Sequence, residues 1–483
     1  MVFSDLFFLF VFIPAFALCY LLGGMIDKLS SDPQTGIRSY GGKNTALVVF
    51  SLIFYAWGEP VYVLLMLFSV FLNYLAGLCI NKTEGRGRKA SLIVGLALNL
   101  LILGTFKYLN FFVDQLAALG IHVDAPTIAL PIGISFYTFQ SIYYLVDVYR
   151  GEAPVQRRFG GLLLYISMFP QLIAGPIVRY NTIASEIHDR HVSANDFAEG
   201  AYRFLIGLGK KVILANQLSE ISDQFLTNGL GQLTTTGAWV GVVAFTLQIY
   251  FDFSGYSDMA IGMGRCMGFH FNENFRHPYC CNSISDFWRR WHISLGSFFR
   301  DYVYIPMGGN RRHQPVNILV VWFLTGMWHG ASWNFIIWGL YFGLIVMVEK
   351  YTILRIKSPL ARPFLHIYSL VLVVIGWGIF YFDDFTNMTT FFTAFFGGTE
   401  TFFDFVTESA LTDNFWLWVA ALLLCMPLRS GALHLLQRYT REGGTVQTTL
   451  LFTVRTVVSI VILVFSVALL VGATNNAFIY TRF

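Results

Sequence analysis

The stretch VNILVVWFLTGMWHGASWNFIIWGLYFGLIVMV, from Val316 to Val348, contains 33 residues and no Asp, Glu, Lys or Arg. One helical crossing of a bilayer needs about 20 apolar residues. Basic residues flank the stretch at Arg311–Arg312 and at Lys350, so both of its ends are expected on one side of the membrane. Two crossings leave about 16 residues each, roughly 24 Å of helix, which is less than the ~30 Å hydrocarbon core. The chain is therefore expected to turn inside a thinned or water-filled region, with Gly330 permitting the bend and His329 beside it.

An ionisable side chain at membrane depth is costly to bury, and it indicates a functional site by default. Imidazole titrates near neutral pH, so His329 can take a proton from a hydroxyl as a general base. A histidine that only hydrogen-bonds neighbouring helices is the alternative on this reasoning alone.

Composition restricts the class of protein. Of 483 residues, 55% are hydrophobic and only 12% are charged. A soluble domain carries roughly twice that fraction of charge, so a soluble globule, a disordered chain, a collagen and a coiled coil are excluded. Six cysteines are dispersed without C-x-x-C spacing, which indicates neither a disulfide framework nor a metal site. We expect an all-α, polytopic membrane protein forming a single domain over residues 1–483, with no nucleic acid as a partner.

Apolar runs predict about ten to twelve transmembrane helices. They cover residues 6–25, 45–57, 60–80, 91–113, 128–148, 237–262, 316–349, 364–382, 414–428 and 451–471. Short loops rich in Lys and Arg stay cytoplasmic, and the basic residues of the first five loops number three, zero, four, zero and three. The basic loops 350–362 and 429–441 enclose segment 363–428, which has six acids and no Lys or Arg. This pattern predicts an N-terminus outside the cytoplasm and an external segment 363–428.

An amphipathic block spans residues 263–313, with seven arginines against three acids. Apolar residues between Ile284 and Tyr302 recur at i, i+3, i+4 and i+7, which predicts one helix at the cytoplasmic interface, capped by Ser283 or Ser285. On this helix His292 lies about 20° beyond the apolar arc, where it can face a cavity, although a histidine satisfied by backbone groups is the alternative. The arginines can dock the phosphates of a cytoplasmic cofactor, and the candidate contacts are Arg289, Arg290, Arg311 and Arg312. Binding of lipid headgroups is the other explanation of these arginines.

Two acids, Asp252 and Asp258, lie inside an apolar run and need partners. Arg265 and Arg276 are the expected ones. Asp252 is either a substrate contact or part of a structural polar network.

The sequence from His191 to Asp196 matches the H-x-x-x-x-D pattern of one glycerolipid acyltransferase class. Ser193 and Asp196 also resemble a capping box at a helix start, and we expect no catalysis there. Walker A, H-E-x-x-H and G-x-S-x-G sequences are absent from the chain, so neither an ATP cradle nor a nucleophile elbow is expected.

Three long motifs resemble the membrane-bound O-acyltransferase (MBOAT) family. They are FWRRWHISL at 287–295, FRDYVYIPMGGNR at 299–311 and LTGMWHGASWNF at 324–335, with shorter pieces at 174–180, 250–259 and 273–275. The likeness covers most of the chain and is strongest to the bacterial branch that O-acetylates alginate. It implies a multi-helix membrane fold in which the family's catalytic histidine is His329 and its second histidine is His292. Trp328 and Asn334 flank His329 in the same motif and are candidate substrate contacts.

The resemblance also implies an activity. The protein would be an O-acyltransferase that moves an acyl group, which we expect to be acetyl, across the membrane. The donor would be a cytoplasmic acyl thioester, acetyl-CoA or an acyl carrier, used as a substrate, with no cofactor bound. The acceptor would be an extracytoplasmic polysaccharide. A periplasmic or extracellular acetyltransferase would be the partner in its modification. The protein would be located in the inner (cytoplasmic) cell membrane. Transfer of D-alanine, transport of an acyl intermediate without chemistry and a non-catalytic scaffold are the alternatives.

Overall fold

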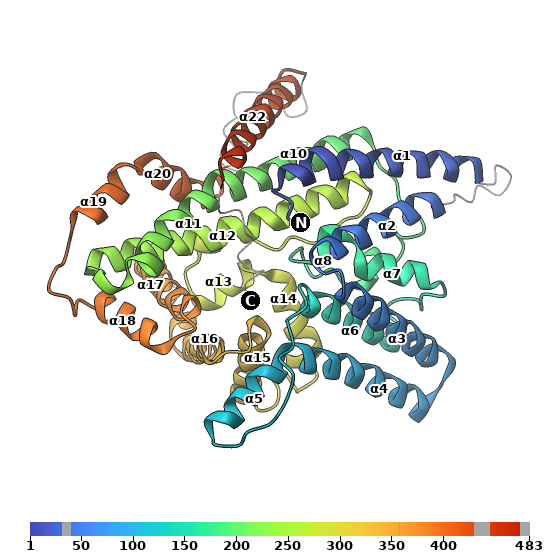
Figure 1. Ribbon diagram of the computed structural model, residues 1–483, viewed down its shortest axis with the longest axis horizontal. Coiled ribbons are helices and arrows are strands. Elements are labelled where there is room, and N and C mark those ends of the chain that lie inside the picture. Colours follow the sequence, from blue (N-terminus) through green and yellow to red (C-terminus); the bar gives the residue numbers. More distant parts are fainter. Residues whose placement is uncertain (31–39, 357, 429–444, 474–483) are drawn as a thin grey trace. The chain divides into compact units, whose positions relative to one another are not determined.

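The computed structural model describes residues 1–30, 40–356, 358–428 and 445–473, and the regular structure in these ranges is entirely helical (Figure 1). The all-α prediction is therefore confirmed. Arg38, Lys357 and the stretch 429–441, which enter the loop-charge prediction, lie outside the described residues. The chain divides into two compact units. Unit 1 comprises Met1–Phe204 and Tyr256–Asn272, and unit 2 comprises Leu205–Gly255 and the described residues from Glu273 onward.

Six of the described helices are long and apolar enough to cross a membrane. They are Phe8–Ser30, Tyr62–Lys82, Gly85–Ala118, Trp333–Arg355, Pro359–Tyr381 and Thr449–Val471. Each of them overlaps one of the apolar runs, so the chain is a multi-pass membrane protein. The other runs are also helical, in helices that are shorter or less apolar. These are α2 (Gly41–Gly58), α6 (Ile134–Arg150), α12 (Thr235–Cys266), α15 (Gln314–His329) and α20 (Phe415–Leu424).

Unit 1 is built from the N-terminal helices. Besides α2 and α6 these are α1 (Ile13–Ser30), α3 (Tyr62–Lys82), α4 (Gly85–Leu103), α5 (Leu109–Ala118), α7 (Phe159–Ser167), α8 (Phe169–Leu172), α9 (Tyr180–Ile183) and most of α10 (Ala194–Gly209). α1 packs on α2, and α3, α4 and α6 pack on one another (Figure 1). At the start of α10, the Ser193 hydroxyl accepts a hydrogen bond from the Asp196 amide at 3.1 Å, and the Ser193 amide donates to the Asp196 carboxylate at 3.2 Å. The capping box is thus confirmed.

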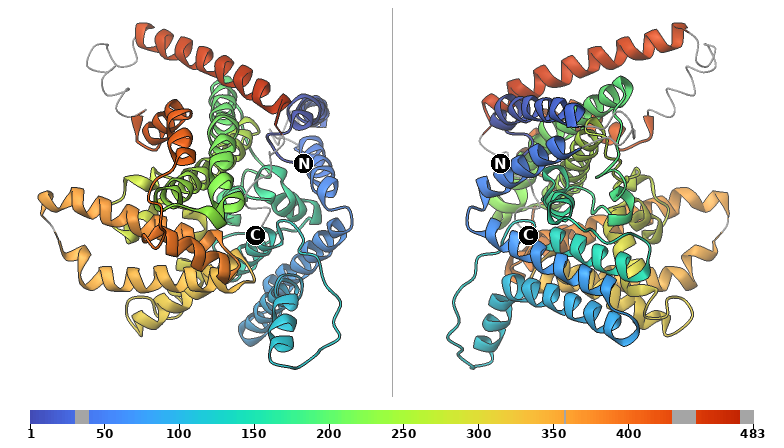
Figure 2. Two further views of the ribbon diagram at one scale, coloured as in Figure 1. Left: turned by 60° about the vertical axis from the view of Figure 1, so that its left-hand side comes forward. Right: turned by 90° about the vertical axis from the view of Figure 1, so that its right-hand side faces the viewer.

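Unit 2 carries both histidine motifs. Besides most of α12, α15 and α20, its helices are α11 (Asn216–Asp223), α13 (Ile284–Arg290), α14 (Ile293–Phe299), α16 (Trp333–Tyr351), α17 (Arg362–Tyr381), α18 (Phe385–Phe395), α19 (Phe405–Thr412) and α22 (Thr445–Val471). α15 packs along α16 and α16 along α17, visible as the gold to orange helices of Figure 2. The short helix α13 contacts both α16 and α17.

The single amphipathic helix predicted between Ile284 and Tyr302 is wrong. α13 ends at Arg290 and α14 begins at Ile293, because His292 has φ 44° and ψ 53°, in the left-handed region. The segment around Asn274 supplies hydrogen bonds that replace those of a continuous helix. The Ile293 amide donates to the Asn274 carbonyl at 3.0 Å, and the Arg290 carbonyl accepts from the Arg276 amide at 2.9 Å. At the start of α13, the predicted cap is confirmed, since the Ser283 hydroxyl accepts from the Asp286 amide at 2.9 Å.

The predicted turn next to His329 is present. α15 ends at His329 and α16 begins at Trp333. Gly330 is extended, with φ −172°, so it is required by space rather than by backbone conformation. A Cβ at Gly330 would overlap the Phe335 ring, and a Cβ at Gly339 would overlap the Trp322 carbonyl of α15. The two helices therefore cross with their backbones in close approach.

Candidate functional site

His329 lies in an aromatic enclosure at the C-terminal end of α15. Its side chain is buried, with an exposed fraction of 4%. Ring centroids of Trp328 and Trp338 lie 4.9 Å from the imidazole, and that of Phe380 lies 5.3 Å away. The enclosure is thus formed by α15, α16 and α17, and it contains neither a charged side chain nor a second base among these neighbours.

His292 is also buried, which confirms that it faces inward. Its imidazole meets the ring of Phe253 edge-on at 4.7 Å and the ring of Trp328 at 5.6 Å. Because Trp328 also contacts His329, one indole lies against both histidines. The structure therefore brings His292 together with Trp328 and His329, although the two histidines are 37 positions apart in sequence.

Asn274 fixes the orientation of His292. Its side-chain oxygen accepts hydrogen bonds from the amide of Ser294 at 3.2 Å and from the hydroxyl of Ser294 at 2.9 Å, and it lies 3.2 Å from Nδ1 of His292. A backbone amide can only donate, so the atom facing it is the amide oxygen and Nδ1 of His292 carries the proton. Nε2 therefore holds a lone pair, and it has no hydrogen-bond partner among the described residues.

The same imidazole is held neutral. Burial lowers the pKa of His292 to about 3, because removal from water penalises the charged form. At neutral pH, Nε2 of His292 is consequently a hydrogen-bond acceptor or a base, not a cation. In the sequence, Asn274 stands out only as part of the motif at 273–275, and its spacing from His292 gives no indication of the contact between them.

 Asn274 is therefore a site residue that only the folded chain reveals.

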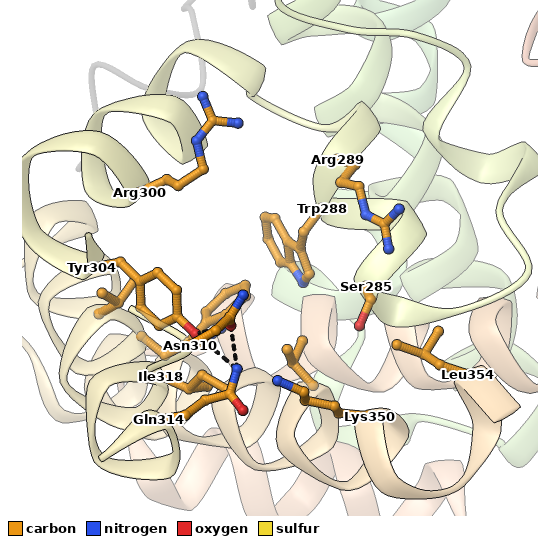
Figure 3. Close-up of a pocket in the computed structure, with 13 residues that line it drawn as sticks. Ser285, Trp288, Arg289, Arg300, Tyr304, Asn310, Gln314, Ile318, Lys350 and Leu354 are labelled. Atoms are coloured by element: carbon orange, nitrogen blue, oxygen red, sulfur yellow. Dashed lines mark hydrogen bonds between the residues drawn. The ribbon is translucent and has the colours of Figure 1, made fainter. Parts of the chain in front are cut away.

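A cavity of about 480 Å³ opens beside α13, α15 and α16 (Figure 3). Two tryptophans, Trp288 and Trp322, line its wall, and three basic side chains line it as well. These are Arg289, Arg300 and Lys350. On the opposite side from Arg289 in Figure 3, Tyr304, Asn310 and Gln314 form a hydrogen-bonded group, with the Tyr304 hydroxyl donating to the Asn310 side-chain oxygen at 2.8 Å. The cavity thus combines apolar walls with a cationic and amide-bearing rim.

The four predicted phosphate contacts do not gather at this cavity. Arg289 lines it, whereas Arg290 is paired with Asp286 at 3.0 Å, and Arg311 and Arg312 are exposed and are not among its lining residues. Arg300, which is paired with Asp301 at 2.7 Å, and Lys350 also line the cavity. Lys350 comes from the end of α16, 61 positions after Arg289, so no local spacing indicated that the two would share a cavity.

The expected partners of Asp252 and Asp258 are wrong. Asp252 pairs with Lys211, with Nζ and Oδ1 2.9 Å apart and both side chains buried. Asp258 pairs with Arg203 at 2.8 Å. Arg265 pairs with Asp196 instead, at 3.2 Å. A lysine one helix away neutralises Asp252, which favours the structural explanation of this acid over a substrate contact.

Asn334 is the second residue of α16 and is almost completely buried. Its side-chain amide donates to the Phe380 carbonyl at 3.1 Å, which ties the start of α16 to α17. Its oxygen is buried and has no hydrogen-bond partner within the described ranges. Asn334 therefore contacts the backbone of Phe380, the residue whose ring lies against His329.

Comparison with known proteins agrees with the motifs. The sequence model of the MBOAT family, membrane-bound O-acyltransferases, matches residues 158–393, which include both histidines. A probable alginate O-acetylase AlgI of Pseudomonas aeruginosa is 42% identical over 390 residues, covering 79% of this chain and 72% of the relative. The chain belongs to the MBOAT family. It is accordingly a multi-pass membrane acyltransferase.

Three further relatives of this acyltransferase also carry names that specify an acceptor. A probable alginate O-acetylase AlgI of Azotobacter vinelandii is 39% identical over 434 residues, covering 88% of this chain and 83% of the relative. A peptidoglycan O-acetyltransferase of Helicobacter pylori is 35% identical over 382 residues, covering 72% of this chain and 70% of the relative. A teichoic acid D-alanyltransferase of Bacillus subtilis is less similar, at 28% over 231 residues and 44% of this chain.

Proposed function

We propose that this acyltransferase moves an acetyl group from a cytoplasmic thioester to a hydroxyl of an extracytoplasmic polysaccharide. The observation that carries the proposal is the buried pair of histidines on either side of Trp328, in a chain whose MBOAT relatives are O-acetylases of alginate and peptidoglycan. The weaker similarity to D-alanyltransferases makes D-alanine the less favoured acyl group.

His329 acts as the general base in this proposal. It removes the proton of the acceptor hydroxyl while that oxygen attacks the thioester carbonyl. The apolar rings around it exclude water, which would otherwise hydrolyse the donor. His292 accepts a hydrogen bond at Nε2 and orients the substrates, since Asn274 holds its proton on Nδ1.

The cavity beside α13 receives the donor. A thioester of coenzyme A combines phosphates with a long pantetheine arm, and the lining matches this combination with three cations at the rim and Trp288 and Trp322 in the wall. A carrier-bound pantetheine presents one phosphate and is the alternative donor.

The membrane placement follows from the loop charges. We propose the cell (inner) membrane as the location, with the N-terminus and the acidic segment 363–428 outside and the block 263–313 on the cytoplasmic side. This arrangement puts the donor cavity in the compartment that holds acyl thioesters. An external acetyltransferase partner would then receive the acetyl group or present the polysaccharide. In this proposal the chain acts as one domain over residues 1–483.

The direct test uses the purified chain in lipid nanodiscs with acetyl-CoA labelled in the acetyl group. We expect loss of the thioester and formation of an alkali-labile ester on added polysaccharide oligomers, or on the external partner protein when that protein is added and receives the acetyl group. A transporter without chemistry would leave the thioester intact, and a scaffold would do so in the absence of its partner.

Removal of the cavity cations should weaken donor binding. In the double variant Arg289→Ala/Lys350→Ala, each lost charge-assisted hydrogen bond costs about 1.5–3 kcal/mol, so the KM for acetyl-CoA should rise by about 100-fold or more. Initial rates at several salt concentrations measure the change, and the salt dependence of KM should flatten. The matched control Arg311→Ala/Arg312→Ala removes two exposed cations outside the cavity and should leave KM within about 3-fold of the wild type. Equal effects of both double variants would contradict this docking site.

Substitution of Asn274 should act through His292. Asn274→Ala leaves the Nδ1 proton of His292 and the Ser294 amide without their acceptor. We therefore expect kcat to fall by at least about 10-fold, which is less than the full rate contribution of a positioned acid or base. Asn274→Asp keeps the acceptor oxygen but adds a charge, which raises the pKa of His292. The acidic limb of the pH–rate profile should therefore move to higher pH in Asn274→Asp alone. An unchanged profile together with an unchanged kcat would show that Asn274 is only structural.

A further inference from the structure

Trp338 has a buried indole N–H that makes no hydrogen bond to the described residues of the fold. The side chain is fully buried on α16, and its Nε1 has no hydrogen-bond partner among the described residues. Indole nitrogen can only donate, and buried tryptophans usually find an acceptor. A donor left unpaired in a dry interior is destabilising, so its retention calls for an explanation.

The position of Trp338 connects the two parts of the site. Its ring centroid lies 4.9 Å from that of His329, with the ring planes at 82°. On another side it lies 5.4 Å from the ring of Trp288, which lines the cavity. Trp338 therefore contacts both His329 and a tryptophan of the cavity wall, so an acyl group that extends from the cavity toward His329 would come close to this indole.

The backbone beside Trp338 is held rigidly. Its neighbour Gly339 lies against the Trp322 carbonyl and Gly326 of α15, so closely that a Cβ would not fit. Trp338 thus has little freedom to move along or around α16. Such rigidity is what stabilisation of a developing charge requires, because donors that are already in place need no reorganisation during the reaction.

We propose that the Trp338 indole N–H donates a hydrogen bond to the carbonyl oxygen of the donor thioester as that oxygen becomes an oxyanion. The inference rests on the proposed function. The acceptor hydroxyl loses its proton to His329, its oxygen forms a bond to the carbonyl carbon, and the π electron pair moves onto the carbonyl oxygen. When the C=O double bond forms again, the C–S bond breaks, and the thiolate leaves with the proton from His329. The charge on oxygen exists only between these two events, so Trp338 acts in the transition state and the intermediate.

The test replaces the N–H without changing the shape of the side chain. 3-Benzothienylalanine at position 338, introduced by nonsense suppression, has sulfur in place of N–H in the same ring system. We expect kcat to fall by about 100-fold, the usual effect of losing one oxyanion donor, with little change in KM for acetyl-CoA. The apparent melting temperature should be equal to or higher than that of the wild type, because an unpaired donor is removed. Trp338→His retains a ring N–H and should recover part of the rate, whereas Trp338→Phe should not.

Trp377→Phe is the matched control. Trp377 is as buried as Trp338 and lies in the same aromatic cluster, 6.2 Å from the ring of Trp338, with no recorded ring contact to His329 among the described residues. We expect it to keep kcat within about 3-fold of the wild type, since no partner of the reacting atoms is removed.

Each result has one interpretation. A wild-type kcat for the benzothienyl variant, or a rise in KM with kcat unchanged, overturns the role of Trp338. A fall in the melting temperature of the same variant also overturns it, because it reveals a structural partner of the N–H. His329→Gln in the same assay tests the proposed function separately. If that variant is inactive while the benzothienyl variant is normal, only the inference about Trp338 fails.

Discussion

Replacement of His329 by alanine is expected to lower kcat for acetyl transfer by about 1,000-fold, within the range that a general base contributes. The rings of Trp328, Trp338 and Phe380 that surround it cannot accept a proton, so no neighbour in the enclosure substitutes for the imidazole. KM for acetyl-CoA should change little, since the proposed phosphate contacts lie in the cavity beside α13. Initial rates of ester formation in nanodiscs measure both constants.

His191→Ala is the matched control for this prediction. His191 belongs to the H-x-x-x-x-D pattern, and its side chain is exposed and 3.6 Å from Asp189. The variant should transfer acetyl at the wild-type rate. Size-exclusion profiles and membrane yield verify that both variants fold. Wild-type activity in His329→Ala would refute the assignment of the base, and loss of activity in His191→Ala alone would move the reaction to unit 1.

The features that sequence predicted well depend on local composition. The uncharged run around His329 predicted a buried histidine at a turn between two helices, and α15 and α16 have this arrangement. The cap at Ser283 and the capping box at Ser193 were also predictable, because each needs only residues three positions apart. Such features are predictable from sequence because the groups that interact are already neighbours along the chain.

The features that sequence missed depend on contacts between distant segments. Periodicity treated Ile284 to Tyr302 as one helix, but the segment at Asn274 supplies hydrogen bonds that make the break at His292 stable. Lys211 neutralises Asp252 from another helix, and Lys350 reaches the cavity from the far end of α16. In each case the residue type was visible in the sequence, whereas its partner was selected by tertiary packing. The orientation of the chain in the membrane stays a prediction.

Glu349 is the second residue whose loss should have a large effect. Its carboxylate is completely buried and accepts hydrogen bonds from the amides of Ile284 at 2.6 Å and Ser285 at 2.8 Å, the first two residues of α13. A negative charge at this end of a helix is favourable, because the exposed amides carry partial positive charge. α13 carries Trp288 and Arg289 of the donor cavity and leads directly to His292. One carboxylate of α16 therefore holds the helix that connects both parts of the site.

Glu349→Ala should lower the free energy of unfolding by about 3 kcal/mol or more, because two backbone amides, one buried and one partly buried, lose a charged acceptor. The apparent melting temperature in detergent, followed by tryptophan fluorescence, measures this loss. The matched control is Asp286→Ala, which removes a carboxylate from the first turn of the same helix. Asp286 is partly exposed and pairs with Arg290, so its removal should cost less than about 1 kcal/mol.

Glu349→Gln separates the charge of this side chain from its shape. Glutamine fits the same space, but its amide can accept only one of the two hydrogen bonds through oxygen, since its nitrogen is a donor that would face the second amide. We therefore expect a stability between those of the wild type and Glu349→Ala. Because α13 would lose its fixed position, KM for acetyl-CoA should rise in both Glu349 variants and not in Asp286→Ala. Equal stability and equal KM in Glu349→Ala and Asp286→Ala would show that α13 is held by its aromatic contacts to α16 and α17 rather than by Glu349.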